Sequence, residues 1–122
     1  MVHLIFCLRR LPHLTRDEFQ RYWREQHAPL VRAHADVLGI RRYVQAHTID
    51  PAMSRAIAES RHAPDPFDGV AELWLDLDVL TARAATPAAM DAGRALLEDE
   101  RRFIDLPNSP IFFADDHVVI GS

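Results

Sequence analysis

The residues best suited to chemistry lie between Phe19 and Val31, where His27 and Pro29 interrupt what otherwise reads as one amphipathic helix. His27 follows Trp23 by four residues, so both side chains should face the core. Pro29 has no backbone N–H, so the helix should kink there. Imidazole moves protons near neutral pH, and isomerisation, cyclisation or dehydration of a carbonyl compound needs a placed base, an acid and a dry pocket. The pattern predicts His27 as a proton-transfer group; alternatively, the kink only wraps the helix around a sheet and His27 bonds a neighbour.

Five side chains are predicted to contact a substrate between this helix and a sheet: Trp23, His34, Tyr43, Glu72 and Trp74. His34 continues the inward stripe of the helix seven residues after His27. Glu72 and Trp74 share one parity on a strand-like, largely apolar segment, so they should point to the same face. An acid in that setting is either paired, for example with an imidazole, or has a raised pKa. A salt bridge from Glu72 to Arg42 across the sheet is the alternative interpretation.

Asp105 and His117 are two further catalytic candidates, which would together carry the chemistry if His27 does not. Asp105 ends the second predicted helix, where its charge opposes the helix dipole and needs a local partner. The alternative for Asp105 is a carboxylate that only forms a turn. The alternative for His117 is a histidine whose hydrogen bonds are satisfied and which does no chemistry.

No metal site is expected, although seven histidines are many for this length. No pair has the spacing of a zinc site, and His27 and His34 would lie about 10 Å apart along a helix. No cofactor is expected either; haem held by one histidine is the alternative. The sequence has no glycine-rich phosphate loop, no Gly-x-Ser-x-Gly and no Cys-x-x-Cys. This argues against nucleotide, esterase and thiol-redox chemistry, and Cys7 in an apolar run is expected to be inert.

The composition indicates one domain over residues 1–122, with 48% hydrophobic residues to form a single core. The net charge of −4 and the lack of a basic run argue against a nucleic-acid partner. No apolar segment approaches the roughly 20 residues of a membrane span, and the amino terminus shows no signal-peptide pattern. The expectation is a cytoplasmic protein without a membrane partner.

The order of elements predicts an α+β fold of the ferredoxin-like βαββαβ type. Four segments read as strands: Val2 to Leu8, Ile40 to Thr48, Val70 to Leu77 and Ile111 to Ile120. A capping box from Thr15 to Glu18 starts the first helix and Gly39 suits its end. Thr86-Pro87 starts the second, and five residues mark one side of it: Met90, Gly93, Leu97, Glu100 and Ile104. Asp78 is expected to cap a short turn before it. This order forms an antiparallel sheet with both long helices on one face.

Two features point beyond a lone protomer. The first and third strands carry apolar residues at positions of both parities, whereas a sheet with one solvated face should alternate cleanly. A second copy packed sheet against sheet would cover that face, so a homodimer is expected. The long segment from Ile49 to Phe67 should hold a short helix over Pro51 to Arg61. It is either a lid, a flap over a sheet edge or an arm that reaches the partner.

Several motifs together resemble an EthD-domain protein, in the right order and over nearly the whole chain. They are Leu4 to Arg10, Phe19 to Val31, Asp68 to Trp74, Glu98 to Asp105 and Asp116 to Ile120. The resemblance implies a dimeric α+β barrel, in which the sheets of two ferredoxin-like protomers pair. It also implies relatives that isomerise, cyclise or dehydrate aromatic and lactone intermediates. The family often ends in Glu-His, whereas this sequence has Asp116-His117.

The resulting hypothesis is a homodimer that binds a small apolar or aromatic carbonyl metabolite. It would act as a cofactor-independent isomerase, cyclase or dehydratase with His27 as the proton shuttle. The competing hypothesis is an accessory or carrier protein that holds a hydrophobic metabolite for a partner oxygenase without turnover. A third class, an oxygenase without cofactor or with haem, differs because it needs oxygen.

Overall fold

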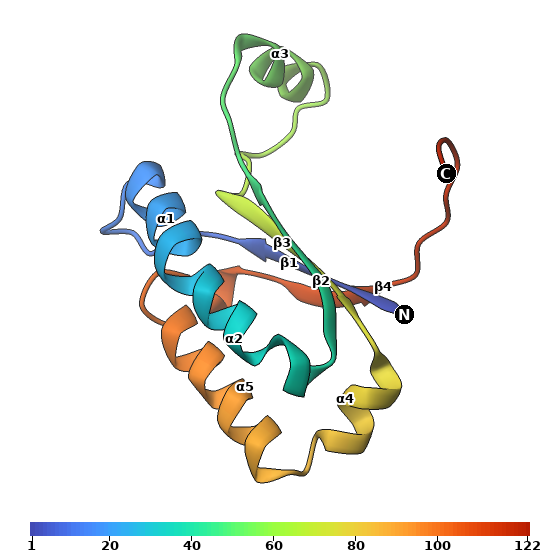
Figure 1. The fold of residues 1–122 in the computed structure, drawn as a ribbon. Helices are drawn as coiled ribbons and strands as arrows, with labels where there is room; N and C mark the ends of the chain where they lie inside the picture. The colour runs from blue at the N-terminus through green and yellow to red at the C-terminus, as the bar shows by residue number, and fades with distance from the viewer.

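Four strands form one antiparallel sheet, and the long helical segments of the chain lie against one of its faces (Figure 1). The computed structural model describes residues 1 to 122. The strands are β1 (Val2–Leu8), β2 (Ile40–His47), β3 (Gly69–Leu75) and β4 (Ile111–Ala114), in the order β2-β3-β1-β4. Each neighbouring pair is antiparallel. This is the ferredoxin-like α+β arrangement that the sequence predicts.

The first helical segment begins and ends where its sequence signals predict. It consists of α1 (Arg16–Tyr22), one π-helical turn η1 (Trp23–His27) and α2 (Ala28–Leu38). The Thr15 hydroxyl accepts the Glu18 N–H and the Glu18 carboxylate accepts the Thr15 N–H, which forms the predicted capping box. Gly39 ends the segment in the left-handed region, at φ 72, and a Cβ there would lie 3.0 Å from the Asp76 carbonyl oxygen.

In this helical segment the buried residues recur every four positions, and the π-helical turn keeps all of them on one face. Four side chains are each at most 5% exposed: Phe19, Trp23, His27 and Val31. A regular α-helix turns about 100° per residue, so residues four apart drift by about 40° at each step. The wider π turn takes up this drift, and the Ala28 N–H bonds the Trp23 carbonyl five residues back. The interruption predicted at Pro29 is therefore a wider turn that ends just before the proline.

The second long helix, α5 (Pro87–Glu100), is capped as predicted but presents a different side to the core. The Thr86 hydroxyl accepts the Ala89 N–H. The buried side carries Ala89, Ala92 and Asp99, whereas Met90 is 53% exposed and Leu97 40% exposed. Of the five residues predicted to mark one side of this helix, Glu100 and Ile104 face the core, whereas Met90, Gly93 and Leu97 are exposed, so the prediction that all five share one side was wrong.

The remaining short elements differ from their predicted bounds by a few residues. Asp76, not Asp78, caps α4 (Leu77–Arg83), and its carboxylate accepts the Val79 N–H. The helix expected after Pro51 is α3 (Ala52–Ser60); it has no buried residue and projects away from the helical layer (Figure 1). A short 3-10 helix, η2 (Leu106–Asn108), precedes β4. No helix of the structure has the length and apolar character needed to cross a membrane.

The two faces of the sheet have different surroundings. Leu4, Phe6 and Leu8 of β1 point toward the helices and help to form the core around Phe19 and Trp23. The opposite face carries apolar side chains that no helix covers, among them Ile5, Cys7, Val44, Val70 and Phe112. The apolar residues of β1 and β3 therefore point to both faces of the sheet.

Candidate active site

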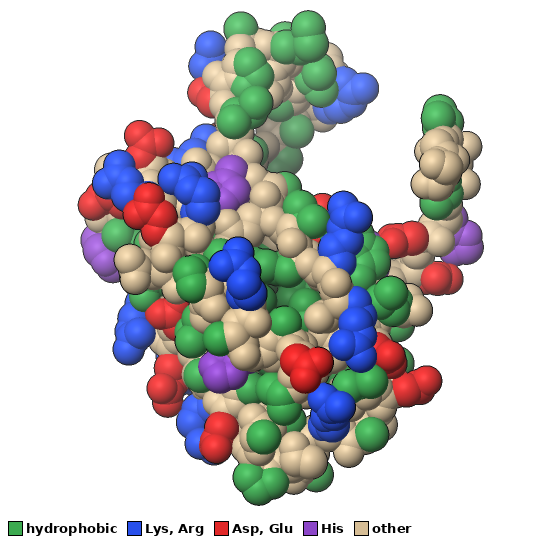
Figure 2. Space-filling view, in the orientation of Figure 1, with side chains coloured by type: hydrophobic (Ala, Val, Ile, Leu, Met, Phe, Trp, Pro, Cys, Tyr) green, Lys and Arg blue, Asp and Glu red, His purple; other side chains and the backbone are tan.

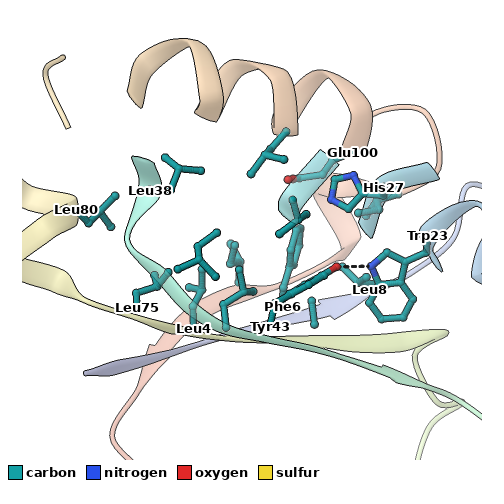
Figure 3. A pocket seen from close by; sticks show the side chains of 17 residues that line it. Leu4, Phe6, Leu8, Trp23, His27, Leu38, Tyr43, Leu75, Leu80 and Glu100 are labelled. Atoms are coloured by element: carbon teal, nitrogen blue, oxygen red, sulfur yellow. Dashed lines mark hydrogen bonds between the residues drawn. The ribbon is translucent and has the colours of Figure 1, made fainter. Parts of the chain in front are cut away.

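A cavity of about 210 Å³ lies between the sheet and the helical layer (Figure 3). Of its 17 lining residues 15 are hydrophobic, and the two others are His27 and Glu100. The hydrophobic lining comes from the inner face of the sheet, for example Leu4 and Leu73, and from α2, for example Val31. A volume of about 150 Å³ is enough for a benzene ring in an apolar cavity. The cavity can therefore hold a small ring compound beside two ionisable side chains.

His27 is fixed in the cavity wall by Asp99 from the facing helix α5. Its Nδ1 lies 2.7 Å from Oδ2 of Asp99, and both side chains are buried. The other oxygen, Oδ1, accepts hydrogen bonds from the Tyr22 hydroxyl at 2.6 Å and from Arg102 Nη1 at 3.1 Å. The ring also packs against Phe103, with centroids 5.1 Å apart. These contacts hold the imidazole plane at one orientation.

The pKa shifts of this pair assign the proton to the imidazole. Burial lowers the pKa of His27, and the contact with Asp99 only partly opposes this. Burial alone would raise the pKa of Asp99, but hydrogen bonds from Tyr22 and His27 outweigh it and lower that pKa. At neutral pH a neutral His27 thus donates its Nδ1–H to a charged Asp99. The lone pair of Nε2, which has no hydrogen-bond partner in the protein, is left to act as a base.

Glu100 supplies the second ionisable group of the cavity. Burial, followed by the nearby charge of Asp99, raises its pKa to about 7. Near neutral pH a large fraction of the Glu100 side chains is therefore protonated and able to donate a proton. Figure 3 shows Glu100 and His27 together at one end of the cavity. A neutral imidazole that can accept a proton and a protonated carboxyl that can donate one, both in an apolar space, are the groups that proton transfer needs.

Tyr43 adds a hydroxyl to the same cavity. Its oxygen accepts hydrogen bonds from Trp23 Nε1 at 3.1 Å and from Gln45 Nε2 at 2.9 Å. Burial raises the pKa of Tyr43, which keeps the phenol protonated. Since both accepted bonds use oxygen lone pairs, the hydroxyl proton remains available to a ligand oxygen. Trp23 in turn stacks on His47, and a Cβ on Gly69 would come within 2.4 Å of its ring, so this corner tolerates little change.

The structure brings three of the predicted site residues together, namely Trp23, His27 and Tyr43. Glu72 and Trp74 lie on the opposite face of the sheet, because Ala71, Leu73 and Leu75 are the residues of β3 that face the helices. The expectation that these two line the cavity was wrong.

Glu72 lies beside an imidazole, as the first of the sequence interpretations predicted, and does not form the alternative salt bridge to Arg42. Its carboxylate lies 3.2 Å from His3 Nε2, and His3 stacks on Trp74 with ring centroids 4.3 Å apart. Arg42 lies over the Trp74 ring instead of bonding Glu72, 4.9 Å from the ring centroid. Asp116 also contacts His3, at 2.8 Å from Nδ1. This cluster belongs to the outer face of the sheet.

The other three predicted residues do not line the cavity. His34 is rotated away, because the π turn shifts the phase of α2 so that Val31 and Leu38 face inward. Asp105 accepts a hydrogen bond from Asn108 at 2.8 Å, which is the turn-forming alternative. His117 is exposed and lies 3.4 Å from Asp115. No three His, Cys, Asp or Glu side chains in the structure are arranged to hold a metal ion.

Sequence reasoning missed Asp99, Glu100 and Tyr22. Asp99 and Glu100 stand in the run Glu98-Asp-Glu-Arg-Arg102, which has the composition of a solvated helix end. The signal that would have found Asp99 is its helical spacing from Ala92 and Phe103, seven residues before and four after it, which are both buried.

The chain is similar to one protein family and to several solved structures. Residues 11–107 match the model of the EthD domain family. An ethyl tert-butyl ether d (EthD) family protein from Bacillus halodurans C-125 has 17% identity and a TM-score of 0.59, with 96% of this chain and 100% of that chain covered. A dimeric protein of unknown function and ferredoxin-like fold from Bacteroides fragilis NCTC 9343 has 11% identity and a TM-score of 0.56, covering 94% and 95%. SnoaB, a cofactor-independent oxygenase from Streptomyces nogalater, has 17% identity and a TM-score of 0.51, covering 98% of both. No curated protein sequence matches the chain.

Proposed function

Because this chain belongs to the EthD domain family, we propose that its cavity binds a small apolar or aromatic carbonyl or lactone compound and that His27 moves a proton on it. The observation that carries the proposal is the buried Asp99–His27 pair, which leaves one imidazole nitrogen free in an apolar cavity. Glu100 supports it as the second ionisable group of that cavity. The reaction class is a cofactor-independent isomerisation, cyclisation or dehydration.

In the proposed reaction each polar group has one task. Nε2 of His27 takes a proton from the carbon next to the carbonyl group, and the charged Asp99 stabilises the imidazolium that forms. The Tyr43 hydroxyl donates a hydrogen bond to the carbonyl oxygen as negative charge develops there. Glu100 in its protonated form delivers a proton at a second atom of the substrate. His27 then returns its proton to Glu100 through the substrate or solvent, which restores the starting state.

Two other functions share the same cavity. A carrier needs only the apolar lining, which 15 of 17 residues provide. A cofactor-independent oxygenase, the activity named for SnoaB, would use the same first step, because removal of a proton makes the substrate electron-rich toward oxygen. Oxygen consumption separates that reaction from an isomerisation.

The test uses a benzisoxazole, whose ring opens when a base removes one proton, together with a panel of lactones and aromatic ketones. We expect turnover by the wild type and a fall of about 10²- to 10⁴-fold in His27→Gln and Asp99→Asn with little change in ligand affinity. His117→Gln, an exposed histidine away from the cavity, is the matched control. Binding without turnover by the wild type would support the carrier, and equal turnover by His27→Gln would place the base elsewhere.

We also propose that the protein is a homodimer in which a second copy covers the outer face of the sheet. The apolar side chains of that face, such as Val44, Val70 and Phe112, have no cover within the protomer. The α3 segment and the end of the chain both project beyond the sheet (Figure 1), and Val119 is 90% exposed. Burial of apolar area contributes about 25 cal/mol per Å², so covering this face favours association.

A further inference from the structure

A groove lies on the outer side of one wall of the cavity, between α2 and β2. It has a volume of about 250 Å³ and is lined by Ala28, Val31, Arg32, Ala35, Ile40, Arg41, Arg42 and Tyr43. Val31, Ile40 and Tyr43 line the cavity as well, so the two spaces adjoin along these side chains. In Figure 2 this side of the molecule faces the reader, with recessed hydrophobic side chains near the centre and Arg side chains around them.

Three arginines line the groove; Arg42 lies over the Trp74 ring, and the other two are weakly paired. Arg41 stands opposite no residue of β3, because the register shifts between Ile40 and Arg42, and such a bulge redirects a side chain. Its guanidinium lies 4.0 Å from Asp36 and 3.8 Å from Asp76, which are long contacts at an exposed site. Arg32, on the facing side of the groove, has no carboxylate within 4.0 Å. Both guanidinium groups therefore retain free N–H donors.

The cavity offers no cation to a ligand. Its lining contains no arginine, its two ionisable residues are His27 and Glu100, and the charged Asp99 lies directly behind His27. A negative group buried there would be repelled by Asp99 and would lose its hydration without gaining a cation. An anionic part of a ligand is therefore disfavoured in the cavity and favoured at the groove.

We propose that the ligand of this protein is an amphipathic acid, with an apolar ring system in the cavity and a carboxylate held in the groove between Arg32 and Arg41. This rests on the proposed function for the apolar part and adds the class of substrate. Guanidinium groups bind carboxylates through two parallel hydrogen bonds, which a neutral ligand cannot replace. The side chains of Val31, Ile40 and Tyr43 form the boundary that the ligand spans.

The test compares 2-naphthoate with its methyl ester, which has the same ring and no charge, by titration calorimetry at low salt. We expect the wild type to bind naphthoate at least tenfold more tightly than the ester. Arg32→Gln/Arg41→Gln should abolish this preference while ester affinity stays the same. Arg61→Gln/Arg94→Gln removes the same charge at other exposed positions and should retain the preference. High salt should reduce the preference in the wild type, because it screens exposed charges.

A variant with a smaller cavity tests whether the aromatic ring of the probe binds there. Ala71→Leu adds volume at a residue that lines the cavity but not the groove, so it should weaken both probes. If the wild type binds the ester as well as naphthoate, the inference is overturned while the proposed apolar cavity stands. If neither probe binds, both proposals fail. Naphthoate binding that Ala71→Leu leaves unchanged also overturns the inference, because the ring would then lie outside the cavity.

Discussion

Glu100 is an ionisable side chain in an otherwise apolar wall, and this makes stability depend on pH. Its pKa is about 7 in the folded protein, compared with an ordinary value of 4.5. Above pH 4.5 the unfolded chain ionises at this residue while the folded protein stays neutral, so stability falls as pH rises from 4.5 through 7 and levels off once the folded protein ionises as well. The difference corresponds to about 3 kcal/mol at most.

Glu100→Gln removes this penalty, since an amide does not ionise. We expect the variant to be more stable than the wild type by about 2 to 3 kcal/mol at pH 8 and by little at pH 4.5, measured by urea denaturation. The contribution of His27 to stability depends on pH in the opposite direction, because its lowered pKa costs stability as the pH falls below 6.5. Both proteins contain His27, so this contribution cancels in the comparison. Glu98→Gln, an exposed neighbour on α5, is the control. Equal gains at both pH values would contradict the raised pKa.

Among the elements, the π turn η1 determines which residues reach the cavity. It acts as one extra residue in a helix whose buried side chains are spaced four apart. Deletion of the exposed Gln26 should therefore give a regular α-helix that still buries Trp23 and Val31, so we expect unchanged or greater stability in thermal denaturation. His27 would shift by about 1.5 Å along the axis and lose its short contact with Asp99, so activity should fall.

The matched deletion is that of Ala33, an exposed residue in the regular helix α2. It rotates every following residue by about 100° and should unfold the protein. If the two deletions are equally destabilising, the π turn is required for folding and does not serve as an extra residue.

The same elements show what sequence patterns can and cannot determine. Local signals located the capping box at Thr15, the end at Gly39 and the bounds of β1, because each depends on neighbouring residues only. β4 ends at Ala114 and not at Ile120, because Ala114 pairs with His3 near the first residue of β1, and beyond it no strand is there to pair. His27 was predicted from its spacing, but its partner Asp99 was not, because burial of a carboxylate depends on what α2 and α5 place beside it.

At the scale of the whole molecule, the proposed homodimer rests on the uncovered face of the sheet. We expect the wild type to sediment as a dimer at micromolar concentration and Phe112→Glu to sediment as a folded monomer, because Phe112 points to the outer face and is 48% exposed in the protomer. Phe113→Glu is the matched control: it lies on the same strand, points to the helical side and is 56% exposed, so the dimer should persist. A stable wild-type monomer would exclude the proposed assembly.

The chain has only two tryptophans, and the sheet separates them. Trp23 is 1% exposed beside the cavity, whereas Trp74 stacks on His3 on the outer face. Each indole therefore emits from a different environment: that of Trp23 would change on entry of the proposed ligand, and that of Trp74 on formation of the proposed dimer. In Trp74→Phe the remaining fluorescence reports the cavity alone, and in Trp23→Phe it reports association alone, so the two processes can be followed separately without an attached dye.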